Sequence, residues 1–121
     1  MLEKSLCKAA IQEWKNTRGD YTKVQPLFIA NGTFVFDKPT CEWLIQYCNA
    51  DQFHAYFGVH DDHLVLICAP LTIEGEEADF ESYPCIEFTQ ITEDLHLVET
   101  VVTQAKNWVT LSPNMQITKN S

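Results

Sequence analysis

Hydrophobic positions in the first seventeen residues recur at intervals of three and four. That spacing aligns them along one face of an α-helix, with polar residues on the opposite face. We therefore predict a helix over residues 2–17, which ends at Gly19 because glycine readily adopts the left-handed conformation of a helix terminus. The apolar stripe comprises Leu2, Leu6, Cys7, Ala10, Ile11 and Trp14.

The next segment, PLFIANGTFVFD, places an Asn-Gly pair at 31–32 between two β-favouring apolar runs. An Asn-Gly pair accepts the positive φ angles of a type I′ turn, so the pattern predicts a hairpin with strands at residues 26–30 and 33–36. Asp37 is a good N-cap, and apolar residues with helical spacing follow it. These features predict a second helix over residues 39–49.

A second hairpin is predicted within HAYFGVHDDHLVLICAP, where residues 53–59 and 63–70 favour strands on either side of a polar turn. With Asp61 and Asp62 as a two-residue loop, His60 faces His63 across the hairpin. Slipping the register by one residue would send the two histidines to opposite faces. In the predicted register, the face that we expect to form the core carries Phe53, Ala55, Phe57, Val59, Leu64, Leu66 and Cys68.

The C-terminal part adds one strand and one further helix. CIEFT at 85–89 alternates as a strand does. From Thr92 onward, apolar residues at 95, 98, 102, 105 and 109 favour a third helix, whereas the β-branched residues at 98–103 favour a strand as the alternative. The polar tail from about residue 113 is predicted to be frayed.

Together these elements predict a single α+β domain over residues 1–121, because no repeat or linker divides the chain. We expect a mostly antiparallel sheet of about five strands, formed by two hairpins and one strand, packed against two or three helices. The five cysteines form no CxxC pair and have apolar neighbours, so we expect reduced, buried thiols.

Charge is distributed unevenly along the chain. The sequence has 8 Lys+Arg and 17 Asp+Glu, and none of the bases lies between Pro39 and Ala105, a region that holds thirteen of the acids. Such a surface repels phosphate groups and anionic lipids, so we expect neither nucleic-acid binding nor membrane association. The chain shows no signal-peptide core and no apolar run of membrane-spanning length, and we expect it to be cytoplasmic.

The acids concentrate in EGEEADFE at residues 74–81, which we predict to be an exposed loop. Our leading hypothesis is a noncatalytic domain that binds a basic protein through this loop and the hairpin end, as an immunity or inhibitor protein would. Trp43 and Tyr47, four residues apart on the predicted helix, form an outward aromatic ridge unless the core covers them. The predicted partner-binding residues are Glu74, Glu76, Glu77, Asp79, Glu81, Trp43 and Tyr47.

Two alternatives come from other functional classes. His60 and His63, with Asp61 or Asp62 as an oxygen donor, could chelate a divalent metal, which would suit a metal-binding protein or a metal-dependent hydrolase. The competing interpretation is a polar turn without any cofactor. We find no sequence motif of a nucleophilic enzyme or of a nucleotide-binding loop, so an enzyme is the less favoured class. The third alternative is a small-molecule pocket between the sheet and the helices.

The order FVFD, a short helix and then YFGVHDDHLVLICAP resembles a group of small uncharacterised bacterial proteins. In that group a Tyr-Phe-Gly strand turns through an Asp-containing loop into an apolar strand. The resemblance covers about residues 34–75 and implies the helix-and-hairpin layout, but no activity and no functional residue. The chain departs from the pattern at the turn, where a Gly is expected near Asp62 or His63.

Overall fold

The computed structural model of the protein describes residues 1–91 and two short strands, β7 (Val109–Thr110) and β8 (Thr118–Lys119), which pair with each other. Val109, the last apolar position of the predicted third helix, therefore lies in a strand. The rest of that predicted helix, the alternative strand at 98–103 and most of the tail after 113 lie outside the described residues. None of the helices in the described part is long and apolar enough to cross a membrane.

The first predicted helix is confirmed as α1 (Lys4–Thr17), but the expected left-handed Gly19 is wrong, because Gly19 has no positive φ and the C-cap is Arg18. The two residues before it instead form a short strand, β1 (Leu2–Glu3), which pairs antiparallel with β5 (Ser82–Tyr83). The backbone of Lys4 also donates to the carbonyl oxygen of Glu81 at 2.8 Å. The start of the chain is thus tied to the segment that immediately follows the acidic stretch.

The predicted hairpin at 26–36 is wrong. Its first arm begins in a 3₁₀ turn, η1 (Gln25–Leu27), with Pro26 in its first turn, and a one-turn helix, α2 (Tyr21–Val24), lies just before it. Proline has no N–H for a strand ladder and suits the start of a helical turn. The second arm does form a strand, β2 (Gly32–Phe34), but its partner is β6 (Cys85–Gln90).

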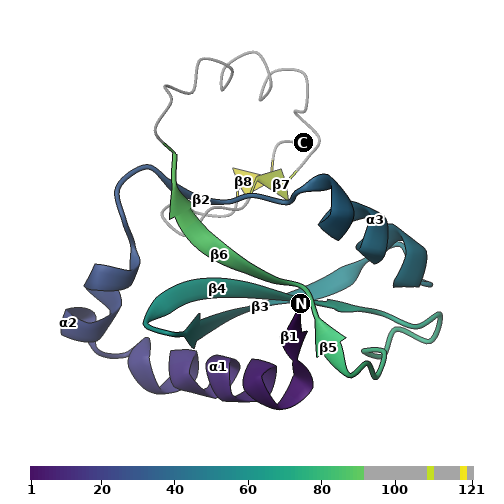
Figure 1. Ribbon diagram of the computed structural model, residues 1–121, viewed down its shortest axis with the longest axis horizontal. Helices are drawn as coiled ribbons and strands as arrows, with labels where there is room; N and C mark the ends of the chain where they lie inside the picture. The colour runs from purple at the N-terminus through teal and green to yellow at the C-terminus, as the bar shows by residue number, and fades with distance from the viewer. Residues whose placement is uncertain (92–108, 111–117, 120–121) are drawn as a thin grey trace.

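The second helix and the second hairpin are confirmed. The helix is α3 (Lys38–Tyr47), and the Asp37 carboxylate caps it by accepting from the Thr40 backbone N–H at 2.9 Å. The hairpin consists of β3 (Phe53–His60) and β4 (His63–Pro70). The main sheet has the order β2-β6-β4-β3, with antiparallel neighbours throughout, so the fold class is α+β (Figure 1).

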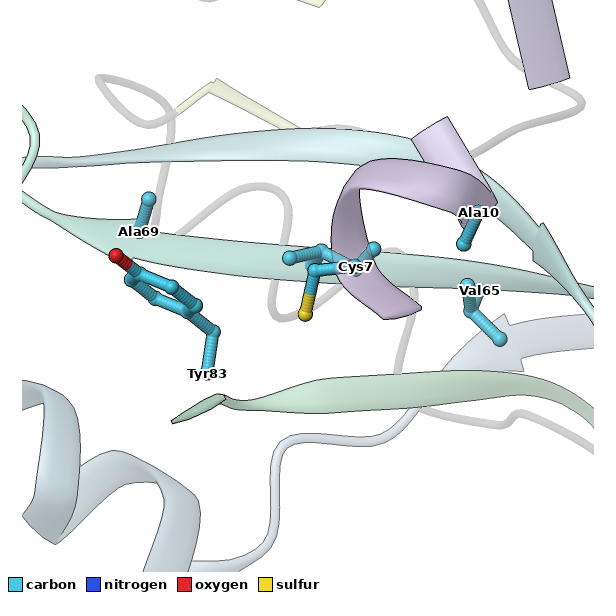
Figure 2. Close-up of a cluster of buried hydrophobic side chains, with 6 residues drawn as sticks. Cys7, Ala10, Val65, Ala69 and Tyr83 are labelled. Carbon is cyan, nitrogen blue, oxygen red and sulfur yellow. The ribbon is translucent and has the colours of Figure 1, made fainter. Parts of the chain in front are cut away.

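The central strand β4 is buried on both faces of the sheet, which corrects the prediction of a single inner face. On the face predicted to be outward, α1 packs through Cys7 and Ala10 against Val65, Ile67 and their neighbours, as Figure 2 shows. On the predicted inner face, α3 packs through Leu44 against a second buried cluster, comprising Leu66, Cys68 and Ile86. Seven consecutive residues of β4, 64–70, are buried, because the strand lies between two helical layers.

Side chains from the two edge strands of the main sheet meet over one of its faces. Phe34 of β2 and Phe57 of β3 belong to opposite edges, yet their ring centroids are 6.1 Å apart. Between these strands, β6 pairs with β4 through its first half and with β2 through its second half. The two edge strands therefore flank a shared hollow.

Candidate functional site

The turn of the β3–β4 hairpin has the predicted register. His60 pairs directly with His63, and the pairs Val59–Leu64 and Phe57–Leu66 follow. Asp61 and Asp62 form the two-residue loop with φ angles of 49° and 63°. Positive φ at both loop positions is the signature of a type I′ turn, whose twist matches that of the flanking strands.

Each of the two histidines at the hairpin end contacts a carboxylate. His63 Nε2 lies 3.5 Å from Glu87 Oε1 on the neighbouring strand β6, and His63 Nδ1 lies 2.7 Å from the carbonyl oxygen of Asp61. His60 Nε2 lies 3.4 Å from Asp61 Oδ2. Within residues 1–91 and the two short C-terminal strands, no group of three or more His, Cys, Asp or Glu side chains is arranged to hold a metal. The metal hypothesis gains no support from this arrangement.

The hairpin end and the acidic segment, residues 74–81, lie at opposite ends of the β3–β4 hairpin (Figure 1). Each of these strands has 8 residues, and a strand rises about 3.3 Å per residue, which separates the two features by about 25 Å. The partner surface that we predicted from both features is therefore not one patch. The acidic segment has to be considered by itself.

The acidic segment begins in a tight turn that continues from β4. Thr72 N–H donates to the Glu76 carbonyl at 2.7 Å, Gly75 N–H donates to the Thr72 carbonyl at 2.9 Å, and Leu71 forms a bridge with Glu77. Gly75 has a φ of 84°, a conformation that is strained for side chains with a Cβ. The predicted exposed loop is thus confirmed, and its first part is a hydrogen-bonded turn.

Glu77 fastens the acidic segment to the edge strand β3. Its Oε2 atom accepts a hydrogen bond from the Tyr56 hydroxyl and lies 2.7 Å from His54 Nδ1. The bond to Glu77 is the main reason why the pKa of Tyr56 is raised to about 12. Partial burial by itself would raise the pKa of Glu77, but the hydrogen bonds from Tyr56 and His54 outweigh it and lower that pKa.

A second acid of the segment, Asp79, forms an ion pair with Lys4 at the start of α1. The hydrogen bond and the opposite charge raise the pKa of Lys4 and lower that of Asp79. Both side chains are solvent-exposed, so this pair positions the segment more than it stabilises the fold. Lys4 and Asp79 are 75 residues apart, and no local pattern in the sequence could have paired them.

The aromatic ridge on α3 is a binding platform for the segment itself. Phe80 packs against Trp43 and Tyr47 with ring centroids 5.2 and 5.5 Å away, and Trp43 and Tyr47 are 4.9 Å apart. Tyr83 completes the attachment, since its hydroxyl donates to the Ala78 carbonyl at 2.7 Å and accepts from Phe80 N–H at 3.0 Å. Trp43 and Tyr47 therefore do not form the free outward ridge that we expected.

Three of the predicted partner-binding acids are accessible to a partner. Glu74, Glu76 and Glu81 are exposed, and none of them takes part in an ion pair within the described part of the chain. Glu77 and Asp79 have structural partners instead. The site thus separates acids that hold the segment in place from acids that it presents to solvent.

An apolar pocket of about 250 Å³ occupies the hollow between the two sheet edges. Thr33 supplies the one hydroxyl among the lining side chains, and the pocket has no charged wall residue. The lining residues are Thr33, Phe34, Phe36, Phe53, Ala55, Phe57 and Leu66. The walls of this pocket come from β2, β3, β4 and the residues just after β2, so it is not the pocket predicted between the sheet and the helices.

Burial affects the acidity of three of the five cysteines. All five are free thiols, as predicted, but only Cys7 and Cys68 are buried, and Cys41, Cys48 and Cys85 are half-buried. Burial is the main cause that raises the pKa of Cys68 to about 12 and that of Cys85 to about 11, and it also raises the pKa of Cys7. A raised pKa keeps a thiol protonated and unreactive at neutral pH.

No family model matches this chain, and no curated protein and no solved structure is significantly similar to it.

Proposed function

We propose that this chain is a noncatalytic domain that binds a basic protein through Glu74, Glu76 and Glu81. The observation that carries the proposal is the attachment of the acidic segment at three points: Glu77 on β3, Asp79 on α1 and Phe80 on α3. A segment held in this way loses little conformational entropy on binding, which favours recognition by its exposed acids.

The charge distribution supports the same function. The described middle of the chain contains no Lys or Arg, so the cations beside the segment come from α1, where Lys4 and Lys8 line a hollow with Glu81. A field of one sign accelerates encounter with a partner of the opposite sign and weakens as salt is added. Immunity and inhibitor proteins work in this manner when they cover a basic surface.

The proposal is tested with a defined basic probe, a blocked lysine- and arginine-rich peptide, titrated against the full chain by NMR and calorimetry. We expect the backbone amides of residues 74–81 to shift, and we expect the affinity to fall by about tenfold between low and physiological salt. If the shifted amides cluster at the hairpin end instead, the proposed site is wrong.

Two variants with the same change in charge locate the binding surface. Glu74→Gln with Glu76→Gln removes two negative charges from the acidic segment. Asp61→Asn with Asp62→Asn removes two from the hairpin end, and Asn tolerates the positive φ angles of that turn. We expect only the first pair to weaken binding, by about tenfold. If both pairs weaken binding equally, the interaction depends only on the net charge of the chain, which would contradict a specific site.

A further inference from the structure

The outer edge of β3 is open over half of its length. Within the described part of the chain, β3 pairs only with β4, and residues 53–56 are exposed. From Phe57 onward the edge is covered, because the Trp14 ring lies 5.4 Å from the Phe57 ring. Natural edge strands are usually protected by lysine, proline or a bulge, and the open stretch, FHAY, has none of these.

The backbone groups that this edge offers follow from the hairpin register. A two-residue turn is closed by a hydrogen-bonded pair, here His60 with His63, and bonded and non-bonded pairs alternate from there. His54 and Tyr56 therefore bond to β4, whereas the N–H and C=O groups of Phe53 and Ala55 point outward. Two observations on β4 agree with this alternation of bonded and non-bonded pairs. Cys68, opposite Ala55, donates its N–H toward Pro84 at 3.0 Å, and Pro70, opposite Phe53, has no N–H.

The two sides of the open edge differ in chemistry. On one side, Phe53 and Ala55 form part of the wall of the apolar pocket. On the other side, His54 and Tyr56 hold the Glu77 carboxylate, and both contacts use Oε2. Among the described residues, Oε1 of Glu77 accepts no hydrogen bond, so it can receive one from a cation. An added strand would present alternate side chains to these two environments.

We propose that β3 binds an extended segment of the partner as an additional strand, and that this segment alternates apolar and basic residues. The apolar side chains enter the pocket beside Phe53 and Ala55, and the basic ones face Glu77 and the exposed acids beyond it. The backbone groups of Phe53 and Ala55 supply the ladder hydrogen bonds. The expectation of basic side chains in the partner segment rests on the proposed function. The expectation of apolar side chains rests on the pocket beside Phe53 and Ala55.

The test compares two blocked peptides of identical composition and charge, KVKFKVK and KKVFVKK. Only the first places all of its apolar residues on one face of a strand. We expect it to bind the full chain about tenfold more tightly and to protect the Phe53 and Ala55 amides from hydrogen exchange. Equal affinity for the two peptides would overturn the added strand.

Substitutions at Ala55 test the edge directly. Ala55→Pro removes an outward N–H without breaking a bond to β4, so we expect it to abolish the preference for KVKFKVK. Ala55→Lys places a cation at the same edge and is expected to do likewise, even if the proline variant does not fold. Ala9→Lys on the exposed face of α1 is the matched control and should leave the preference unchanged.

The outcomes separate this inference from the proposed function. If both peptides bind equally and Glu74→Gln with Glu76→Gln weakens both, the acidic site stands and the added strand is wrong. If the preference for KVKFKVK is lost in Ala55→Lys but binding is unchanged by the Glu→Gln pair, the added strand stands and the acidic site is wrong.

Discussion

Tyr56 of β3 donates its hydroxyl hydrogen to the Glu77 carboxylate and thereby connects the edge strand to the acidic segment. The same carboxylate also contacts His54, so one acid holds two neighbouring side chains of β3. This contact is the point at which the proposed acidic surface and the proposed strand-binding edge meet. A change at Tyr56 should therefore be measurable in both stability and binding.

Replacing Tyr56 by Phe should lower the free energy of unfolding by about 0.5 kcal/mol at neutral pH, a small value because water competes for this half-exposed carboxylate. The pKa of folded Glu77 lies below its ordinary value of 4.5. The stabilisation that the ionised Glu77 carboxylate gives to the folded state is therefore complete above that pH. It is lost as the pH falls through the folded pKa. Urea unfolding at about pH 7 and about pH 3 should show the difference between wild type and variant shrinking in acid. Tyr21→Phe, at an exposed tyrosine, is the control, and a constant difference would contradict this account.

Gly58 lies where β3 passes closest to α1. A Cβ added there would lie 3.1 Å from Ala10 Cβ and 3.2 Å from Val65 Cγ2. Gly58→Ala should push the helix from the sheet and destabilise the fold by about 1–3 kcal/mol. Gly19→Ala is the matched control, since an added Cβ at Gly19 meets nothing within 4 Å. Thermal unfolding of the two variants checks this prediction, which fails if they melt together.

The protein should be more stable with glycine than with the native aspartate at position 62, the second residue of the hairpin turn. Asp62 has a φ of 63°, which costs a side chain with a Cβ more than it costs glycine. Asp62→Gly should therefore raise the free energy of unfolding by about 0.5–1 kcal/mol and preserve the register. Asp62→Val should lower it, because a β-branched residue is strained in this conformation. Equal stability of both variants in denaturant titrations would argue against a type I′ turn.

Phe80 should be required to hold the acidic segment against α3. Phe80→Ala removes the contacts with Trp43 and Tyr47, and we expect a loss of about 1–2 kcal/mol in the free energy of unfolding, since the ring is partly buried. Because the exposed acids would then be less ordered, affinity for the basic peptide should also fall. Calorimetry of binding and unfolding measures both effects. Unchanged binding by a destabilised variant would show that the attachment does not organise the acidic site.

Local patterns predicted several elements correctly. The apolar stripe identified α1, Asp37 identified the start of α3, and the Asp61–Asp62 turn gave the register of the β3–β4 hairpin. The first hairpin prediction failed for an instructive reason. The turn residue Asn31 does have a positive φ of 55°, but β2 pairs with β6, far along the chain. A turn signal indicates how the backbone bends, whereas the strand partner is chosen by packing.

In the candidate site too, the local sequence determines some features and tertiary packing determines the others. The sequence by itself determined which acids are concentrated in residues 74–81 and that the described middle of the chain lacks Lys and Arg. Only the tertiary structure decided which of those acids are used internally, since Glu77 meets Tyr56 across the sheet edge and Asp79 meets Lys4 from α1. Charge and periodicity are properties of neighbouring residues, but contacts between distant segments depend on how the helices and strands pack.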